Sequence, residues 1–147
     1  MSSTILQPTA DLVAAVLTGL SVTPAVKGYA TDPGMTGLDS LPAGVCGLPK
    51  VQRTNPDEAE SQLGTFDWQI ELPVMLLFDL YDTTTAQAQA LQTLEAFIKA
   101  VDTGTLQTSD AQIVDAKVSQ ADPVEFLDEA RPMVGYDCRV EILRYTT

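Results

Sequence analysis

An alternating run between positions 66 and 80 constrains the fold of this chain more than any other segment. Every even position in the run is apolar: Phe66, Trp68, Ile70, Leu72, Val74, Leu76, Phe78 and Leu80. Because successive side chains of a strand point to opposite faces, this spacing predicts one long strand with these residues on one face. The odd positions are polar at first (Asp67, Gln69, Glu71) and later apolar (Met75, Leu77). We therefore expect the strand to begin with one face in water and to end with both faces covered.

Pro73 lies in the middle of this run. Proline has no backbone N–H to donate to a ladder, so a bulge or an edge position is expected there. At about 3.3 Å per residue the whole run would span roughly 50 Å, which is long for a small domain. The strand is therefore expected to bend at Pro73 or to project from its own domain, where a neighbouring copy would pair with its free edge.

The other segments supply helices and further strands. Their patterns predict helices over 8–20 and 83–103 and strands over 25–30, 45–51 (at an edge), 112–120 and 134–142. The 112–120 strand is expected to face inward at Val114, Ala116 and Val118, before a turn at Asp122-Pro123 and a helical turn within 124–130. Polar loops are expected over 31–44 and 53–64. The order predicts one domain over 1–147 with an α+β fold: a mixed, largely antiparallel sheet with an N-terminal helix and one longer helix (about 83–103) packed on one face.

The charge balance excludes several classes of protein. The chain has 20 acidic and 8 basic residues, a formal net charge of −12, and no histidine. Such a surface repels phosphate backbones, so specific or tight nucleic-acid binding is not expected. No apolar run is long enough for a membrane span, and the first residues do not resemble a signal peptide. We therefore expect a protein made in the cytosol.

Motifs that carry catalytic chemistry are missing from the sequence. It contains no nucleophile elbow, no phosphate-binding glycine loop and no zinc-protease motif. Two acidic groups deserve comparison with a cation site: Asp79 with Asp82, and Asp122 with Glu125, Asp128 and Glu129. Neither has the ligand alternation and central glycine of a calcium loop, so a helix cap and a solvated turn explain them better. We expect no enzyme activity, no metal and no cofactor.

Three further groups of residues have a structural and a functional interpretation. Cys46 and Cys138 match no metal or redox spacing and are expected to be buried thiols. Trp68 and Tyr136 are expected to pack in the core rather than to stack on a ligand. Arg131, Arg139 and Arg144 would either pair with acids inside the domain or contact acidic surface on a neighbouring copy. Both alternatives remain open for the arginines at this point.

The arrangement of elements resembles the tail terminator (tail completion) proteins of long-tailed bacteriophages. The matching parts are a short N-terminal helix, a loop through Leu41-Pro42-Ala43, the strand 68–74, the helix segment 87–94 and the closing strand 136–142. The resemblance spans nearly the whole chain and rests on arrangement, with no diagnostic short motif.

The resemblance implies a structural role in the virion. Members of this family form a hexameric ring that caps the tail tube, stops its growth and joins the tail to the head connector or stopper, with no active site. It implies a protein of the tail and neck, assembled in the host cytoplasm, whose partners are its own copies, the tail tube protein and the connector. DNA would pass through an acidic lumen without specific binding, and no membrane is involved.

Three other functions remain as alternatives. Within the same class the chain could be another neck component, such as the stopper, or a tail tube subunit. From another class, it could be a small cytosolic binding module that holds a ligand with the loops at 31–44 and 54–65. For the ring hypothesis, we expect the charged strand face bearing Asp137, Arg139 and Glu141 to contact other copies or the tail tube, together with Arg131 and Arg144.

Overall fold

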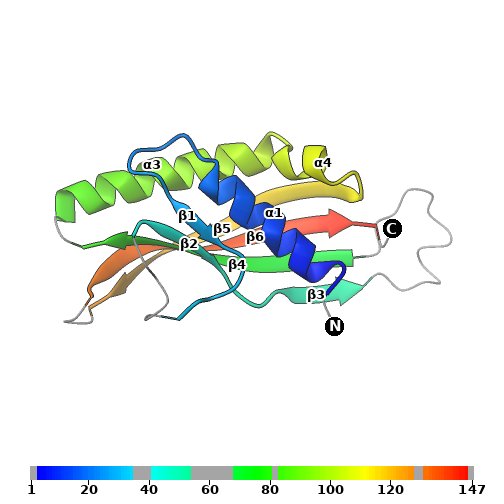
Figure 1. Ribbon diagram of the computed structural model, residues 1–147, viewed down its shortest axis with the longest axis horizontal. Coiled ribbons are helices and arrows are strands. Elements are labelled where there is room, and N and C mark those ends of the chain that lie inside the picture. The colour runs from blue at the N-terminus through cyan, green and yellow to red at the C-terminus, as the bar shows by residue number, and fades with distance from the viewer. Residues whose placement is uncertain (1–2, 35–40, 54–67, 81–82, 128–130, 146–147) are drawn as a thin grey trace.

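The computed structural model of this protein describes residues 3–34, 41–53, 68–80, 83–127 and 131–145. It has an α+β fold in which three helices lie on one face of a mixed sheet of six strands, counted over these residues (Figure 1). The strand order is β1-β2-β4-β6-β5, and β3 pairs with β4. The predicted fold class is therefore confirmed. No described helix is both long and apolar enough to cross a membrane.

The described residues form three helices and six strands. The helices are α1 (Leu6–Thr18), α3 (Thr83–Asp102) and α4 (Thr105–Ser109). The strands are β1 (Lys27–Tyr29), β2 (Ala43–Cys46), β3 (Lys50–Arg53), β4 (Trp68–Asp79), β5 (Ile113–Phe126) and β6 (Met133–Arg144). The β1–β2 pair is parallel and all other pairs are antiparallel.

The long strand β4 runs without interruption through Pro73, so the predicted bulge or edge is wrong. On one side β4 pairs with β6 along its whole length, with Pro73 opposite Arg139. On the other side β2 pairs with 74–77 and β3 with 68–71. The Pro73 carbonyl accepts a hydrogen bond from Gly47 N at 2.8 Å, in the connection between these two short strands. In an antiparallel ladder the N and C=O of one residue point to the same side, so the missing donor falls where β4 changes partner.

This double pairing also corrects the expectation about a free edge. β4 lies inside the sheet and has no long edge to offer to a second copy. The long strand with only one described neighbour is β5, which pairs with β6. The expectation that a neighbouring copy pairs with a free edge of this strand is therefore wrong.

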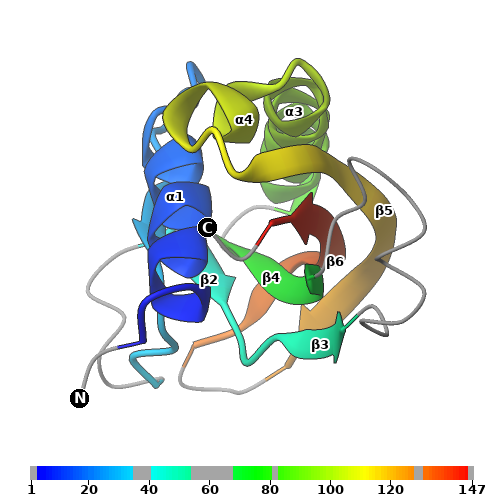
Figure 2. The ribbon, with the colours of Figure 1, turned by 90° about the vertical axis from the view of Figure 1, so that its right-hand side faces the viewer.

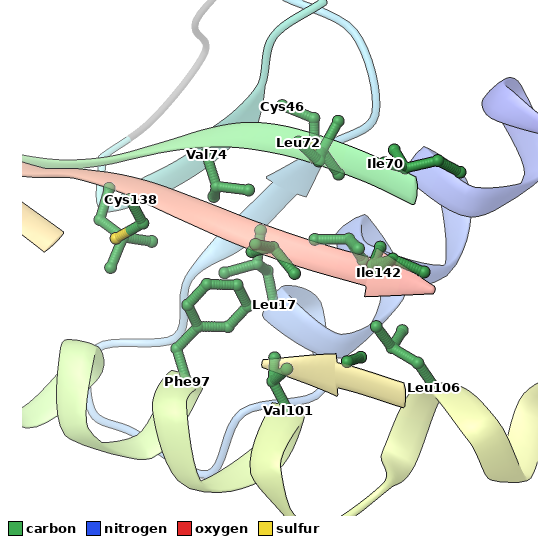
Figure 3. Close-up of a cluster of buried hydrophobic side chains, with 14 of the residues drawn as sticks. Leu17, Cys46, Ile70, Leu72, Val74, Phe97, Val101, Leu106, Cys138 and Ile142 are labelled. Carbon is green, nitrogen blue, oxygen red and sulfur yellow. The ribbon is translucent and has the colours of Figure 1, made fainter. Parts of the chain in front are cut away.

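The core lies between the helices and the even positions of β4 and β6. Figure 3 shows Phe97 and Val101 of α3 pointing toward Ile142 of β6 and Leu17 of α1. The even positions 70–78 of β4 are each at most 1% exposed, as the alternating sequence predicts. Burial of large apolar side chains of this kind stabilises a fold by roughly 1.5–3 kcal/mol each.

Two short strands replace the single edge strand predicted over 45–51. β2 is buried throughout and lies between β1 and β4, not at an edge. Gly44 makes this possible, because a Cβ atom at that position would lie 2.7 Å from Leu17 Cδ1 of α1. β3 follows after Gly47-Leu48-Pro49 and, among the described residues, pairs only with β4.

β5 is longer than predicted and differs in which residues face inward. It continues through Pro123 to Phe126, where a turn and a helical turn were expected. Register shifts against β6 leave Val114 and Ser119 as extra residues. Val114 is consequently 42% exposed, whereas Ile113 and Ala116 are buried and Val118 packs against the core. The inward prediction is thus wrong for Val114 and right for Ala116 and Val118.

The helices begin and end near the predicted positions. α1 starts two residues before Pro8, and Ser3 Oγ accepts hydrogen bonds from Leu6 N and Gln7 N. α3 matches the predicted 83–103 helix, and Gly104 after it has φ +87°. The sequence interpretation missed α4. Most of the two predicted polar loops, together with Asp82, Asp128, Glu129 and Ala130, lies outside the described residues.

Candidate interaction surface

The face of the sheet away from the helices carries the charged residues that the sequence analysis singled out. We call it the open face and define it by the odd positions of β4 and β6 and their cross-strand partners. Asp137, Arg139 and Glu141 of β6 lie on it, and each is half-buried. Since β4 and β5 flank β6 on its two sides (Figure 2), these three residues occupy the middle of the sheet rather than its rim.

Charges on the open face form rows across the strands. One row places Lys50, Glu71, Glu141 and Lys117 side by side on β3, β4, β6 and β5. Lys117 Nζ lies 3.6 Å from Glu141 Oε2. The pair is substantially exposed, so its contribution to stability is at most about 1 kcal/mol. Glu71 and Glu141 stand directly opposite each other, a like-charge pairing that costs stability unless cations lie close by.

The next two rows contain Arg139 and two more facing acids. Arg139 lies between Pro73 on β4 and Gln120 on β5. Asp137 is opposite Met75 on one side and Asp122 on the other. Along β6, Arg139 therefore lies between Asp137 and Glu141. Its positive charge offsets part of the negative charge on both neighbouring rows.

The two other arginines have different environments. Arg144 is 5% exposed, and its Nη1 lies 3.2 Å from Asp110 Oδ2. Its Nε also donates to the carbonyl of Tyr145 at 2.9 Å. Of the two alternatives for this residue, the pair inside the domain is the one observed. Arg131 is half-buried beside the start of β6.

An apolar patch occupies the end of the open face where β4 finishes. Its buried members are Ala43, Val45, Leu77 and Met133, with Tyr29, Leu41 and Met75 packed against them. A hollow of about 370 Å³ lies above them, bordered by Phe126, Asp32 and Gly34. Phe126 and Leu127 are 39% and 70% exposed. Large apolar side chains at a strand end, next to a hollow, are typical of surfaces that contact other proteins.

The two aromatic residues lie on the core side of the sheet, as predicted. Trp68 and Tyr136 are half-buried and pack against the core cluster. The Arg53 guanidinium lies over the Trp68 ring, 4.4 Å from its centroid. A cation in this position gains roughly 0.5–1 kcal/mol at an exposed site. The contact holds β3 against the start of β4.

Both cysteines are buried free thiols. Burial and, to a lesser extent, the charge of Asp11 together raise the pKa of Cys46 from 9.0 to about 12. Burial, with smaller contributions from Asp137 and Asp122, likewise raises the pKa of Cys138 from 9.0 to about 12. Thiolates are the reactive form of cysteine, so neither side chain is placed to act as a nucleophile near neutral pH.

These raised pKa values predict a loss of stability at alkaline pH. The unfolded thiols ionise above pH 9.0, whereas the folded thiols keep their protons until about pH 12. The stabilisation is thus complete below pH 9 and is lost as the pH rises toward 12, by about 1.4 kcal/mol per pH unit for each thiol. Urea unfolding of the wild type and of Cys46→Ala/Cys138→Ala between pH 8 and 11 measures this. Equal slopes in the two proteins would contradict the assignment.

A second hollow lies between the start of α1 and the β2–β3 connection. It measures about 450 Å³ and is mostly apolar, with Leu6, Ala10, Cys46, Gly47 and Leu48 among its lining residues. Within the described ranges, no three histidine, cysteine, aspartate or glutamate side chains come together to hold a metal ion.

Comparison of the sequence with protein-family models and with curated proteins finds no match.

The sequence analysis missed two features of this surface. The apolar patch combines residues from β2, β4 and β6 that lie up to 90 positions apart, so no local pattern shows it. The unpaired outer side of β5 was not predicted, because a turn was expected at Pro123. The sequence does contain a signal for it, since a proline after an alternating segment is also compatible with an edge strand.

Proposed function

We propose that this chain is the tail terminator protein of a long-tailed bacteriophage: a ring of copies that caps the tail tube, stops its growth and joins the tail to the head connector. The observation that carries the proposal is the two-sidedness of the sheet. Helices cover one face, while the long strands β4 and β6 present half-buried charges and an apolar patch on the other. The α+β order of elements also agrees with the fold that the family resemblance implies.

The charge of the chain suits a channel for DNA. Each copy carries a formal net charge of −12, and a ring of six would carry −72. A lumen of that sign repels the phosphate backbone, so duplex DNA slides through without sticking. The same repulsion acts between copies at low salt. Assembly is accordingly favoured by ionic strength and by an existing tube end.

The test is electron microscopy of the concentrated full-length protein in moderate salt. Single closed rings are expected, and they support the terminator assignment. Long filaments would instead indicate a tail tube subunit, because a tube protein stacks through many identical layers. Monomers that bind a small molecule tightly in a thermal-shift screen, and that never form rings, would indicate the binding module.

Arg139→Glu tests the role of the open face. The substitution adds a carboxylate between Asp137 and Glu141, so we expect ring formation to fall at least several-fold while the far-ultraviolet circular dichroism stays unchanged. Lys99→Glu on the exposed side of α3 is the matched control and is expected to leave ring formation intact. An equal yield of rings from Arg139→Glu and from the wild type would remove the open face from the proposed contacts.

A further inference from the structure

Within one copy of the chain, the outer backbone edge of β5 has no strand partner among the described residues. Its fourteen residues pair with β6 alone. Such an edge invites pairing with another chain unless bulges or prolines interrupt it. Here Val114 and Ser119 are bulged, and Pro123 has no N–H to donate. The stretch Gln120–Asp122 lies between the second bulge and the proline and is one of the short windows that remain for pairing.

β3 lies at the opposite edge of the sheet and is similar in length to this window. Its four residues, Lys50–Arg53, pair with β4, and Pro49 precedes them. β3 carries two basic residues and no acid. β5 carries three acids, Asp115, Asp122 and Glu125, and one base, Lys117. The two edges of one sheet thus have opposite charge.

We propose that β3 of one copy adds to the outer edge of β5 in the next copy, antiparallel, with Lys50 opposite Asp122. The inference rests on the proposed ring and names the contact that closes it. Within one chain β5 runs parallel to β4, and β3 runs antiparallel to β4. Rotation about a ring axis keeps the component of each strand direction along that axis, so if the strands run along the axis an incoming β3 meets β5 in the antiparallel sense.

The side chains select this register. Lys50 and Gln52 lie on the open face and Val51 on the core face, so an incoming strand must meet β5 residues of the same faces. Lys50 can then stand opposite Asp115, Lys117, Gln120, Asp122, Val124 or Phe126. Two of these are acids. Asp115 lies next to the bulge at Val114, which would interrupt the ladder opposite Val51, so Asp122 is the acid that fits. That register also places Val51 opposite Ala121 and Gln52 opposite Gln120, an apolar pair and an amide pair.

Pro49 and Pro123 favour the same register. With Lys50 opposite Asp122, Pro49 stands opposite Pro123. Neither residue has an N–H, so the ladder stops on both strands at one point. At the other end Arg53 meets the bulge at Ser119. Three of the four residues of β3, Lys50 to Gln52, thus fill the window between the two interruptions.

Symmetric pairing of like edges is disfavoured by the same charges. Two paired β5 strands would bring acidic residues together. Two paired β3 strands would bring Lys50 and Arg53 of one copy close to the basic residues Lys50 and Arg53 of the other. A symmetric contact also closes a dimer, whereas the β3–β5 contact is head-to-tail and generates a ring when the rotation between copies closes.

Disulfide cross-linking of the full chain tests the register. Gln52→Cys and Gln120→Cys in one chain would face each other across neighbouring copies, and cross-strand Cβ atoms about 4.5–5.5 Å apart are near disulfide distance. The native thiols do not interfere, because Cys46 and Cys138 are 1% and 0% exposed. Oxidation of the concentrated protein is expected to give a ladder of covalent oligomers that ends at the ring size. A mixture of the two single variants is expected to stop at dimers.

The control pairs Gln52→Cys with Lys117→Cys, which shifts the register by three residues, about 10 Å along the strand. It is expected to stay monomeric on a non-reducing gel. The β3–β5 contact is overturned if the shifted pair cross-links as well as the matched pair. It is also overturned if the matched pair stays monomeric while the wild type forms rings, and in that case the terminator function survives. Cross-linked open chains without rings or tube capping would support the edge contact and overturn the terminator function.

Discussion

Replacing Gly135 with alanine is expected to prevent the protein from folding stably. Gly135 lies inside β6 opposite Leu77 of β4 and is buried. A methyl group there would overlap the carbonyl oxygen of Leu76 and would lie 2.7 Å from its carbonyl carbon. The obstacle is backbone in the centre of the sheet and cannot rotate away. We expect destabilisation by about 3 kcal/mol or more, measured as the shift in the midpoint of urea unfolding.

Gly104→Ala provides the matched control for that experiment. Gly104 has φ +87°, but the nearest atom to an added methyl group is 3.8 Å away. The cost should therefore be that of the left-handed backbone alone, about 1–2 kcal/mol. If Gly135→Ala unfolds at the same urea concentration as Gly104→Ala, the close approach of β4 and β6 at Leu76 is not a constraint on the sequence.

Replacing Asp110 with alanine is expected to be the second most damaging change. It leaves the guanidinium of Arg144 buried without its carboxylate, 3.2 Å away in the wild type. It also removes the acceptor of the Gln112 N–H, which donates to Asp110 Oδ1 at 2.9 Å. An uncompensated buried charge costs about 3–5 kcal/mol. Chemical denaturation should show a loss in this range, since Arg144 is 5% exposed.

Two further variants separate the charge from the packing. Asp102→Ala, at the exposed end of α3, should change stability by less than about 0.5 kcal/mol. Arg144→Met/Asp110→Leu removes both charges and is expected to recover most of the loss, because buried ion pairs are often replaced by apolar residues without penalty. A double variant that is as unstable as Asp110→Ala would show that the loss does not come from the unpaired charge.

The parts of the fold that follow from local patterns were predictable. The even positions of β4 and the apolar stripe of α3 have one clear period each. The structure buries the even positions 70–78 of β4 and Ala90, Phe97 and Val101 of α3 on the core side, whereas Leu91 of the predicted stripe is 58% exposed. β6 likewise has the alternation expected from the sequence. In these elements the residues that define the period are also the residues that pack, so local and tertiary preferences agree.

The failures have a shared physical cause, which is tertiary context. Pro73 does not interrupt β4, because its missing N–H falls where β4 changes partner from β2 to β3. Pro123 does not end β5, because the outer side of β5 needs no donor within the chain. Both positions depend on what lies beside the strand, which a single sequence does not reveal. Val114 was misplaced for a related reason, since the bulge that turns it outward is set by the register with β6.

The candidate surface was predicted in part. The alternation of β6 places Asp137, Arg139 and Glu141 on one face, and the structure has them there. The same alternation puts Arg144, two positions beyond Ile142, on the core face. It does not indicate the partner there, which is Asp110 on the α4–β5 connection. That pair joins residues 34 positions apart. Only the fold brings them together.

At Pro73 the neighbour of β4 changes from β2 to β3, so each of these two short strands is held in the sheet by its own contacts. β2 is locked by α1 through Leu17 and by full burial, while β3 is joined to β4 by four residues and the stacking of Arg53 on Trp68. Because the two strands bond to separate halves of β4, β3 can detach or shift without loosening the interior. Elements that bind partners are commonly drawn from the less stable parts of a fold, and β3 is the strand of this sheet with the smallest anchoring of that kind.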